Sequence, residues 1–254
     1  MNTNTESRKI YLSPSGAYAC DSLFSKLSFN IPQLFSRDRL LISNTIKILH
    51  VEIPFSWYII NSNNDLLDLS TGSINLNHGN YNANSFMALI QPLLPINMLI
   101  SFNQANGIFT LTYIANFSIL ETTTCYKLIG CAKNTLYTST TNNLILPYPG
   151  NFLGTKNLYI NIPNMKLDNY NTSTKTYTTL LSVAVDVPPF GIIIYENNNN
   201  NCNTVKGVKD DTLQIEILDD DFNEINFNNI EWNITIEIDT IKQLSFIPNS
   251  SLNN

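Results

Sequence analysis

Residues 44–61 read NTIKILHVEIPFSWYIIN, and this stretch decides how the chain is interpreted. Apolar and polar residues alternate along its first half with a period of two, which is typical of a half-buried β-strand. The apolar residues occupy even-numbered positions up to Ile48 and odd-numbered positions from Leu49 to Ile53. A β-bulge at this point inserts one extra residue and would return the apolar set to a single face. That set is Ile46, Ile48, Leu49, Val51 and Ile53.

The same stretch also indicates how the strand ends. His50 and Glu52 would point away from the core, side by side. Pro54 lacks the N–H group that a strand ladder needs, so the strand is expected to end there. The aromatic residues that follow would cap the end of the core: Phe55, Trp57 and Tyr58. The stretch therefore indicates architecture, and a general base or metal ligand at His50 is the competing interpretation.

Period-two alternation recurs along most of the chain. Asn106-Gly107 joins two alternating segments as a tight hairpin turn. Most segments have one solvated face, as the strands of antiparallel sandwiches require. We therefore predict an all-β fold, an antiparallel β-sandwich, with Trp232 and the isoleucines of the last strand in its core. The further strands are predicted at 26–31, 73–76, 98–102, 108–113, 158–162, 180–185, 191–195, 213–217 and 232–238.

One segment has helical spacing instead. Its apolar residues recur three and four positions apart, Asn82 or Asn84 can serve as the N-cap, and Pro92 and Pro95 end it. A second, shorter helix is expected to end at Gly130. The fold class is thus a sandwich with one short inserted helix and long loops.

The predicted organisation is one domain with a segment outside the core at each end. Residues 26–239 would form the sandwich, with an insertion around 82–149, because the chain is longer than the eight strands of a minimal jelly roll require. Residues 1–25 would form an N-terminal arm and residues 240–254 a C-terminal tail.

The composition limits the classes of partner. Charged residues make up 13% of the chain, about half of the usual share, and the net charge is −6. No stripe of lysine and arginine is present to neutralise phosphates, so nucleic acid is not expected as the main partner. No apolar run approaches the roughly 18 residues of a membrane-spanning helix, so no membrane span is predicted. Asparagine occurs 39 times, and we expect it to fill many of the turns.

No short motif indicates catalysis or a bound cofactor. The two histidines, His50 and His78, are too far apart for a HExxH pattern, and no nucleotide-binding or nucleophile-elbow motif occurs. We expect the chain not to be an enzyme and to need no cofactor. A pair of carboxylates supplied by distant strands is the catalytic arrangement that the sequence leaves open.

The string LDDDFNEINFNNIEW comes nearest to a metal site. Asp219, Asp221 and Asn223 match the first three ligand positions of a Ca²⁺ loop. Glu224 stands where that loop needs glycine, and Ile230 stands where it needs a glutamate. The sequence therefore predicts an acidic connection between the last two strands, and no bound metal.

The order of these strings resembles one known group of proteins. KLSFNIPQLF leads to TIKILHVEIPFSWYIIN, then to INLNHGNYNANSFMALI, the hairpin, LPYPGNFLGTKNLYINIP and LQIEILDDDFNEINFNNIEWNITIEI. Over residues 26–239 this order resembles the jelly-roll penton and minor capsid proteins of virophages, polinton-like viruses and large DNA viruses of eukaryotes.

The resemblance implies a structural subunit without enzymatic activity. Such a subunit would sit in the virion as a homopentamer at the capsid vertex, next to the major capsid protein, after synthesis in the host cell cytoplasm. Arg8, Lys9 and Tyr11, ahead of the sandwich, are expected to contact partners, because arginine and tyrosine are enriched at interfaces. Two alternatives are a non-vertex minor capsid protein (cement or trimeric) and, in another class, a jelly-roll glycan-binding module.

Overall fold

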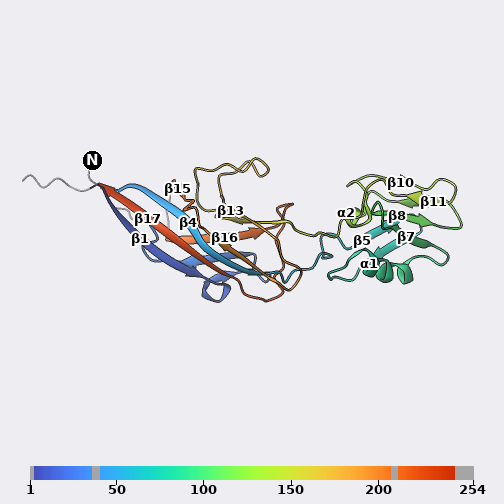
Figure 1. Cartoon of the computed structure of the whole chain (residues 1–254), viewed down its shortest axis with the longest axis horizontal. Helices are drawn as coiled ribbons and strands as arrows, with labels where there is room; N and C mark the ends of the chain where they lie inside the picture. The colour runs from blue at the N-terminus through green and yellow to red at the C-terminus, as the bar shows by residue number, and fades with distance from the viewer. Residues whose placement is uncertain (1–2, 36–40, 207–210, 244–254) are drawn as a thin grey trace, which may run out of the picture. The chain divides into compact units, whose positions relative to one another are not determined.

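The computed structural model describes residues 3–35, 41–206 and 211–243, which form two compact units (Figure 1). Unit 1 combines Met1–Trp57 with Thr155–Asn254, and unit 2 is Tyr58–Gly154. Each unit has a hydrophobic core of its own. This division differs from the single domain expected over 26–239, because the segment that contains the expected 82–149 insertion buries its own apolar side chains.

Two antiparallel sheets face each other in unit 1. The first sheet has the order β1-β17-β4-β14, with β15 also paired to β4, and the second has the order β13-β12-β16-β3-β2. The first sheet consists of β1 (Thr3–Leu12), β4 (Leu41–Pro54), β14 (Ile192–Glu196), β15 (Asn203–Val205) and β17 (Asn233–Gln243). The second consists of β2 (Ala19–Cys20), β3 (Lys26–Asn30), β12 (Asn157–Asn161), β13 (Thr179–Ala184) and β16 (Thr212–Leu218). A 3₁₀ turn, η1 (Pro14–Gly16), follows β1.

The strand order is that of a jelly roll. Without the short β2 and β15, the strands can be numbered one to eight along the chain: β1, β3, β4, β12, β13, β14, β16 and β17. The first sheet then has the order 1-8-3-6, and the second has the order 2-7-4-5. The predicted all-β sandwich is confirmed, and unit 2 is inserted between the third and the fourth of these strands.

Strand β4 has the predicted bulge. Thr235 of β17 pairs with His50, and Ile236 pairs with Ile48, so Leu49 is the extra residue. The apolar positions on both sides of the bulge are buried on one face: Ile46, Ile48, Val51 and Ile53. Leu49 itself is only half-buried. Phe55 and Trp57 belong to the core of unit 1 as expected, whereas Tyr58 is half-buried and begins unit 2.

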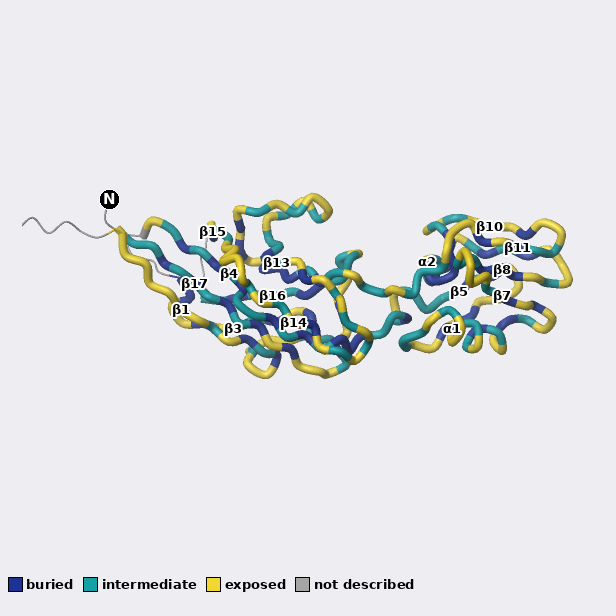
Figure 2. Tube along the Cα trace, in the orientation of Figure 1, coloured by how far each residue is buried: buried dark blue, intermediate teal, exposed yellow. Residues whose placement is uncertain are grey.

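The core of unit 1 contains the predicted face of the last two long strands (Figure 2). Trp232 is fully buried, and its indole N–H donates a hydrogen bond of 2.9 Å to the carbonyl of Phe24. The buried isoleucines beside it are Ile215, Ile217, Ile234, Ile236 and Ile238. These residues come from both sheets, so they join the two layers of the sandwich.

The N-terminal segment is a strand and not an arm outside the core. β1 pairs with β17 along its whole length, from Thr3 opposite Gln243 to Leu12 opposite Ile234. Only Leu12 of this strand is buried, because β1 lies at the edge of its sheet, and its sequence therefore carries no alternation. β17 likewise extends past residue 239. Residues 244–254 of the expected tail lie outside the described part of the chain.

Unit 2 is built from two small sheets and short helices. One sheet has the order β10-β9-β5-β6, and the other has the order β11-β8-β7, which includes the predicted hairpin. The strands are β5 (Leu66–Leu69), β6 (Gly72–Asn75), β7 (Leu99–Asn103), β8 (Ile108–Thr112), β9 (Ser118–Ile119), β10 (Tyr137–Thr138) and β11 (Asn143–Ile145). The helices are α1 (Ala83–Ile90), the 3₁₀ turn η2 (Gln91–Leu93) and α2 (Tyr126–Ile129).

Both predicted helix boundaries in unit 2 are confirmed. Asn82 is the N-cap of α1, where its side chain accepts a hydrogen bond from the backbone N–H of Ser85. The Ser85 hydroxyl in turn accepts a hydrogen bond from the backbone N–H of Asn82. Gly130 ends α2 in the left-handed conformation, with φ of 84°. A Cβ at this position would lie 1.9 Å from the carbonyl oxygen of Tyr148, so only glycine fits there.

We predict that Trp232→Ala lowers the free energy of unfolding of unit 1 by about 3–5 kcal/mol, because the substitution leaves a large cavity and removes an internal hydrogen bond. Chemical denaturation followed by circular dichroism measures the change. Tyr18→Ala, at an exposed aromatic position, is the control and should be nearly neutral. A neutral Trp232→Ala variant would contradict the burial of this side chain.

We further predict two separate thermal transitions, because the two cores are separate. Differential scanning calorimetry should show that Phe86→Ala, in the core of unit 2, lowers the midpoint of one transition only. Trp232→Ala should lower the other. One cooperative transition that both variants shift together would show instead that the units fold as one.

Candidate functional site

The predicted acidic connection is the loop between β16 and β17, and Asp219 organises it. One carboxylate oxygen of Asp219 accepts hydrogen bonds from the backbone N–H groups of Asp221 (2.8 Å) and Asn223 (2.9 Å). Burial raises the pKa of Asp219, and these hydrogen bonds act in the opposite direction. The three residues that matched a Ca²⁺ loop are thus brought together by a closed turn that already uses the Asp219 carboxylate.

The described residues contain no group of three or more His, Cys, Asp or Glu side chains placed to hold a metal ion. Nor is any helix in residues 3–35, 41–206 or 211–243 long and apolar enough to cross a membrane.

The same loop hydrogen-bonds to the two segments of unit 1 that come directly before and directly after unit 2 in the sequence. The Asp220 carboxylate accepts hydrogen bonds from the backbone N–H groups of Lys156 (2.5 Å) and Asn157 (3.2 Å), where the chain re-enters the sandwich. The Ser56 hydroxyl donates a hydrogen bond of 2.8 Å to the carbonyl of Phe227, where the chain leaves it. The loop is therefore a structural clamp, and sequence reasoning missed the role of Asp220 because its partners, in Lys156 and Asn157, are 64 and 63 positions away.

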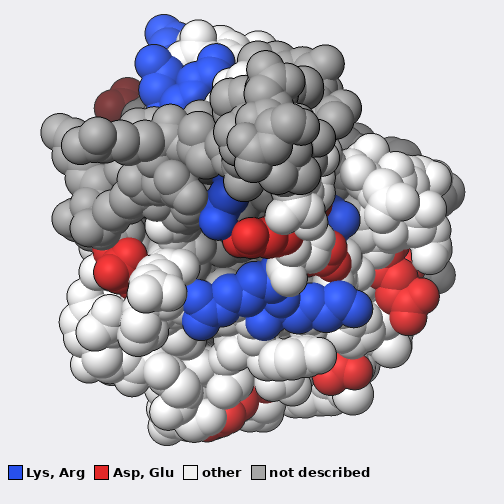
Figure 3. Space-filling view, turned by 90° about the vertical axis from the view of Figure 1, so that its left-hand side faces the viewer, with Lys and Arg blue, Asp and Glu red and all other residues white. Residues whose placement is uncertain are grey.

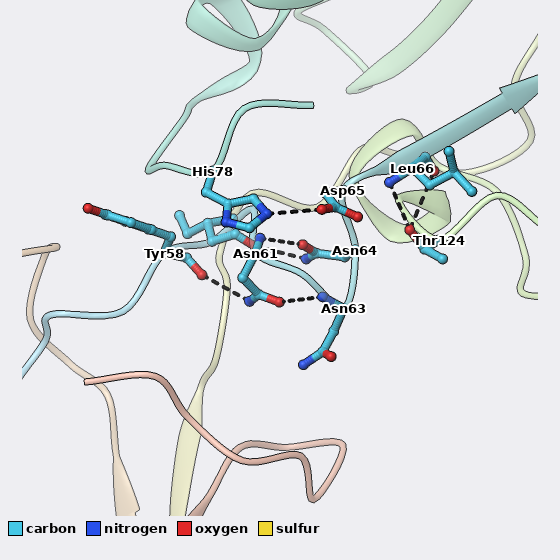
Figure 4. A network of polar contacts seen from close by, with 9 residues as sticks. Tyr58, Asn61, Asn63, Asn64, Asp65, Leu66, His78 and Thr124 are labelled. Atoms are coloured by element: carbon cyan, nitrogen blue, oxygen red, sulfur yellow. Dashed lines mark hydrogen bonds and ion pairs between the residues drawn. The ribbon is translucent and has the colours of Figure 1, made fainter. Parts of the chain in front are cut away.

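Each histidine is paired with a carboxylate of its own unit. In unit 1, His50 Nε2 lies 3.2 Å from Glu52 on the outer face of β4, as the bulge predicts. In unit 2, His78 Nε2 lies 2.9 Å from Asp65, beside a turn in which asparagine side chains bond to the backbone (Figure 4). Both pairs are partly exposed, and each has the geometry of a polar side-chain contact at the surface.

The residues predicted to contact partners all lie on β1. Arg8 points to the inner side of the sheet and donates hydrogen bonds to the carbonyls of Pro32 (2.9 Å) and Gln33 (3.3 Å) of its own chain. Lys9 and Tyr11 lie on the outer face and are exposed, Tyr11 by 77%. Of the three, the structure therefore leaves Lys9 and Tyr11 directed outward.

A cleft of about 620 Å³ opens at the end of unit 1 where β1 begins. It is lined by β1, β17 and the segment after β3, and Arg8, Leu34 and Phe35 contribute to its walls. The Lys242 ammonium lies 2.9 Å from Glu6 at its rim. Figure 3 looks onto this end of the chain, where basic and acidic side chains lie next to one another. The cleft has charges of both signs and therefore no preference for an ion of one sign.

The opposite edge of the same sheet is apolar. Among the described residues β14 pairs with β4 alone, and it is preceded by Phe190, which is 77% exposed. Ile193 points into the core, but Ile192 and Ile194 on the outer face are 58% and 61% exposed. Sequence reasoning placed a strand here and missed this surface. The signal is present in GIIIYE, because three consecutive isoleucines must leave at least one on the solvent face of a strand.

The outer face between the two edges is polar and internally paired. Lys47 of β4 lies 3.3 Å from Glu237 and 3.5 Å from Asp239 of β17. The Ser7 hydroxyl of β1 donates a hydrogen bond of 2.6 Å to Asp239. These contacts satisfy charges of the two central strands within the chain, so within this sheet the edges are the better candidates for contact with a partner.

We predict that Asp219→Ala lowers the free energy of unfolding by about 1–2 kcal/mol, because two backbone N–H groups lose their acceptor. Asp219→Asn keeps an acceptor oxygen and is the matched control. The raised pKa means that ionised Asp219 disfavours the fold. The advantage of the wild type over the asparagine variant should therefore decline as the pH rises from about 4, the unperturbed value of an aspartate. Denaturation midpoints measured between about pH 3 and pH 7 test this, and an advantage that grows with pH would contradict it.

Known proteins resemble this chain in structure and not in sequence. No protein-family model matches the chain, and no curated protein matches it in sequence. Among solved structures, the crystal structure of selenomethionine-labelled mavirus penton protein aligns with 94% of this chain and 100% of its own, at 9% sequence identity and a TM-score of 0.40. A similarity with so low a TM-score supports no functional assignment. The function has to be inferred from the residues of this chain.

Proposed function

We propose that this protein is a structural subunit of an icosahedral DNA virus capsid, and that it fills the fivefold vertices as the penton. The observation that carries the proposal is a jelly roll whose first sheet, as far as the structure describes the chain, ends in two unlike unpaired edges, polar β1 on one side and apolar β14 on the other.

The apolar edge supports an assembly role. This edge exposes an apolar residue at every second position: Phe190, Ile192 and Ile194. They lie on β14 or just before it, and the outer edge of β14 has no neighbour within the described residues. Contiguous exposed apolar patches on a protein surface mark interaction sites. A closed ring of identical subunits needs a heterologous interface, in which two different surfaces of the subunit meet. The two unlike edges supply such a pair.

The resemblance found in the sequence supports the finer assignment. Two of its strings coincide with the points where the chain passes between the units: VEIPFSWYIIN ends β4 and leads out of unit 1, and GNFLGTKNLYINIP leads back into β12. The similarity thus follows the division of the chain into a jelly roll and an inserted unit. Pentons of the resembled group are structural, so the proposed role involves no catalysis and no cofactor. The proposed partners are further copies of the chain and the neighbouring major capsid protein.

Reconstruction of the virus particle tests the assignment. We expect density for this chain around every fivefold axis, as a ring of five copies. Density elsewhere in the shell would refute the penton role and leave a non-vertex minor capsid protein, of the cement or trimeric kind. A particle without the chain would refute the capsid role altogether and favour the jelly-roll glycan-binding module.

A further inference from the structure

We propose that copies of this chain join edge to edge, with β14 of one copy pairing with β1 of the next. The proposal rests on the proposed function, because it names the surfaces through which the ring would form. The partner is a second copy of the chain, and the contact is a continuation of the first sheet of unit 1 from one copy to the next.

The strand directions permit this contact. β1 pairs antiparallel with β17, β17 with β4, and β4 with β14, so β14 runs opposite to β1. Within the sheet Tyr11 is level with Glu196, through Thr235 and His50. A ring whose axis is inclined to the strands keeps neighbouring strands antiparallel and also staggers one copy against the next, as in closed β-barrels. The β14 edge of one copy would therefore meet the β1 edge of the next as an antiparallel pair. Each edge offers a row of backbone N–H and C=O groups, and pairing would satisfy them.

The side chains select one register. In an antiparallel pair of strands, the numbers of any two opposite residues have the same sum. The outer faces of the two copies form one surface only when the odd-numbered residues of β1 lie opposite the even-numbered residues of β14. With Lys9 opposite Glu196, Tyr11 falls opposite Ile194. A shift of two residues in one direction would put the Lys9 ammonium against Ile194, and a shift in the other direction would put Tyr11 against Glu196. The proposed register is the one that matches charge with charge and apolar with apolar.

The inner face agrees with the same register. It places Ile10 opposite Tyr195 and Leu12 opposite Ile193, and all four side chains already belong to or pack against the core of unit 1. The sandwich core of one copy would thereby continue into that of the next. Lys9 and Glu196 are both exposed, so they are available for an ion pair between copies.

Charge reversal on the full-length chain tests the register. Lys9→Glu and Glu196→Lys should each weaken self-association by about tenfold or more, because each puts like charges opposite one another. The double variant Lys9→Glu/Glu196→Lys should restore it. Lys133→Glu, an exposed charge reversal in unit 2, is the control and should leave association unchanged. Native mass spectrometry and light scattering measure the oligomer, and thermal unfolding confirms that each variant is folded.

A second pair of variants tests the apolar part of the contact. Ile194→Asp should dissociate the oligomer, whereas Ile145→Asp, at a position of similar exposure (65%) on β11 of unit 2, should not. Oligomers that persist unchanged in Lys9→Glu, Glu196→Lys and Ile194→Asp would overturn the edge-to-edge contact and leave the penton role standing through another surface. A wild-type chain that stays monomeric at all concentrations, and is absent from the vertices of the particle, would overturn both.

Discussion

The pairing of β4 with β17 is the constraint on which unit 1 depends. These two strands are central in the first sheet, and β1, β14 and β15 are attached to them. A slip of one residue would turn the apolar face of either strand toward water. Two features prevent such a slip. The bulge at Leu49 can pair in one way only, and the buried side chain of Asn44 accepts a hydrogen bond of 3.0 Å from the Thr240 hydroxyl. The register is thus fixed on both sides of the bulge.

Scarcity of charge shapes the rest of the chain. Unit 2 contains three acidic residues and two lysines among its 97 positions (58–154), so asparagine, serine and threonine must supply most of its surface polarity. Asparagine also supplies turns, as the composition predicts. Six of the twelve non-glycine residues with positive φ in the described residues are asparagines. An amide can bond to its own backbone in this conformation, which lowers the cost of leaving the usual region.

The sequence predicts best those elements whose two faces differ. β4, β16 and β17 each have a core side and a water side, and their alternation placed the strands, the bulge and Trp232 correctly. Other features carry no such signal. The edge strand β1 is solvated on nearly all sides, so its sequence resembles that of an arm, and the division into two units depends on long-range contacts. The Asp219 turn was predicted as a loop, and the side-chain hydrogen bond from Asp219 to the backbone two residues on is typical of aspartate in turns. The contacts of Asp220 with Lys156 and Asn157 are long-range, and no local pattern indicates them.

The two edges of the first sheet have to allow pairing between copies and also to limit its length. An apolar edge such as β14 invites pairing of unlimited extent, and open edges that pair freely lead to aggregation. The first half of β1 limits this extent. Its inward-pointing Glu6 and Arg8 are engaged by Lys242 and by the Pro32 and Gln33 carbonyls, which places charge where a longer ladder would need apolar packing. The last four residues, 9–12, are the part that matches residues 193–196 of β14. A contact this short is weak as a single pair. It becomes stable when a ring closes and every subunit is held at both edges, because the release of a subunit then requires two contacts to break.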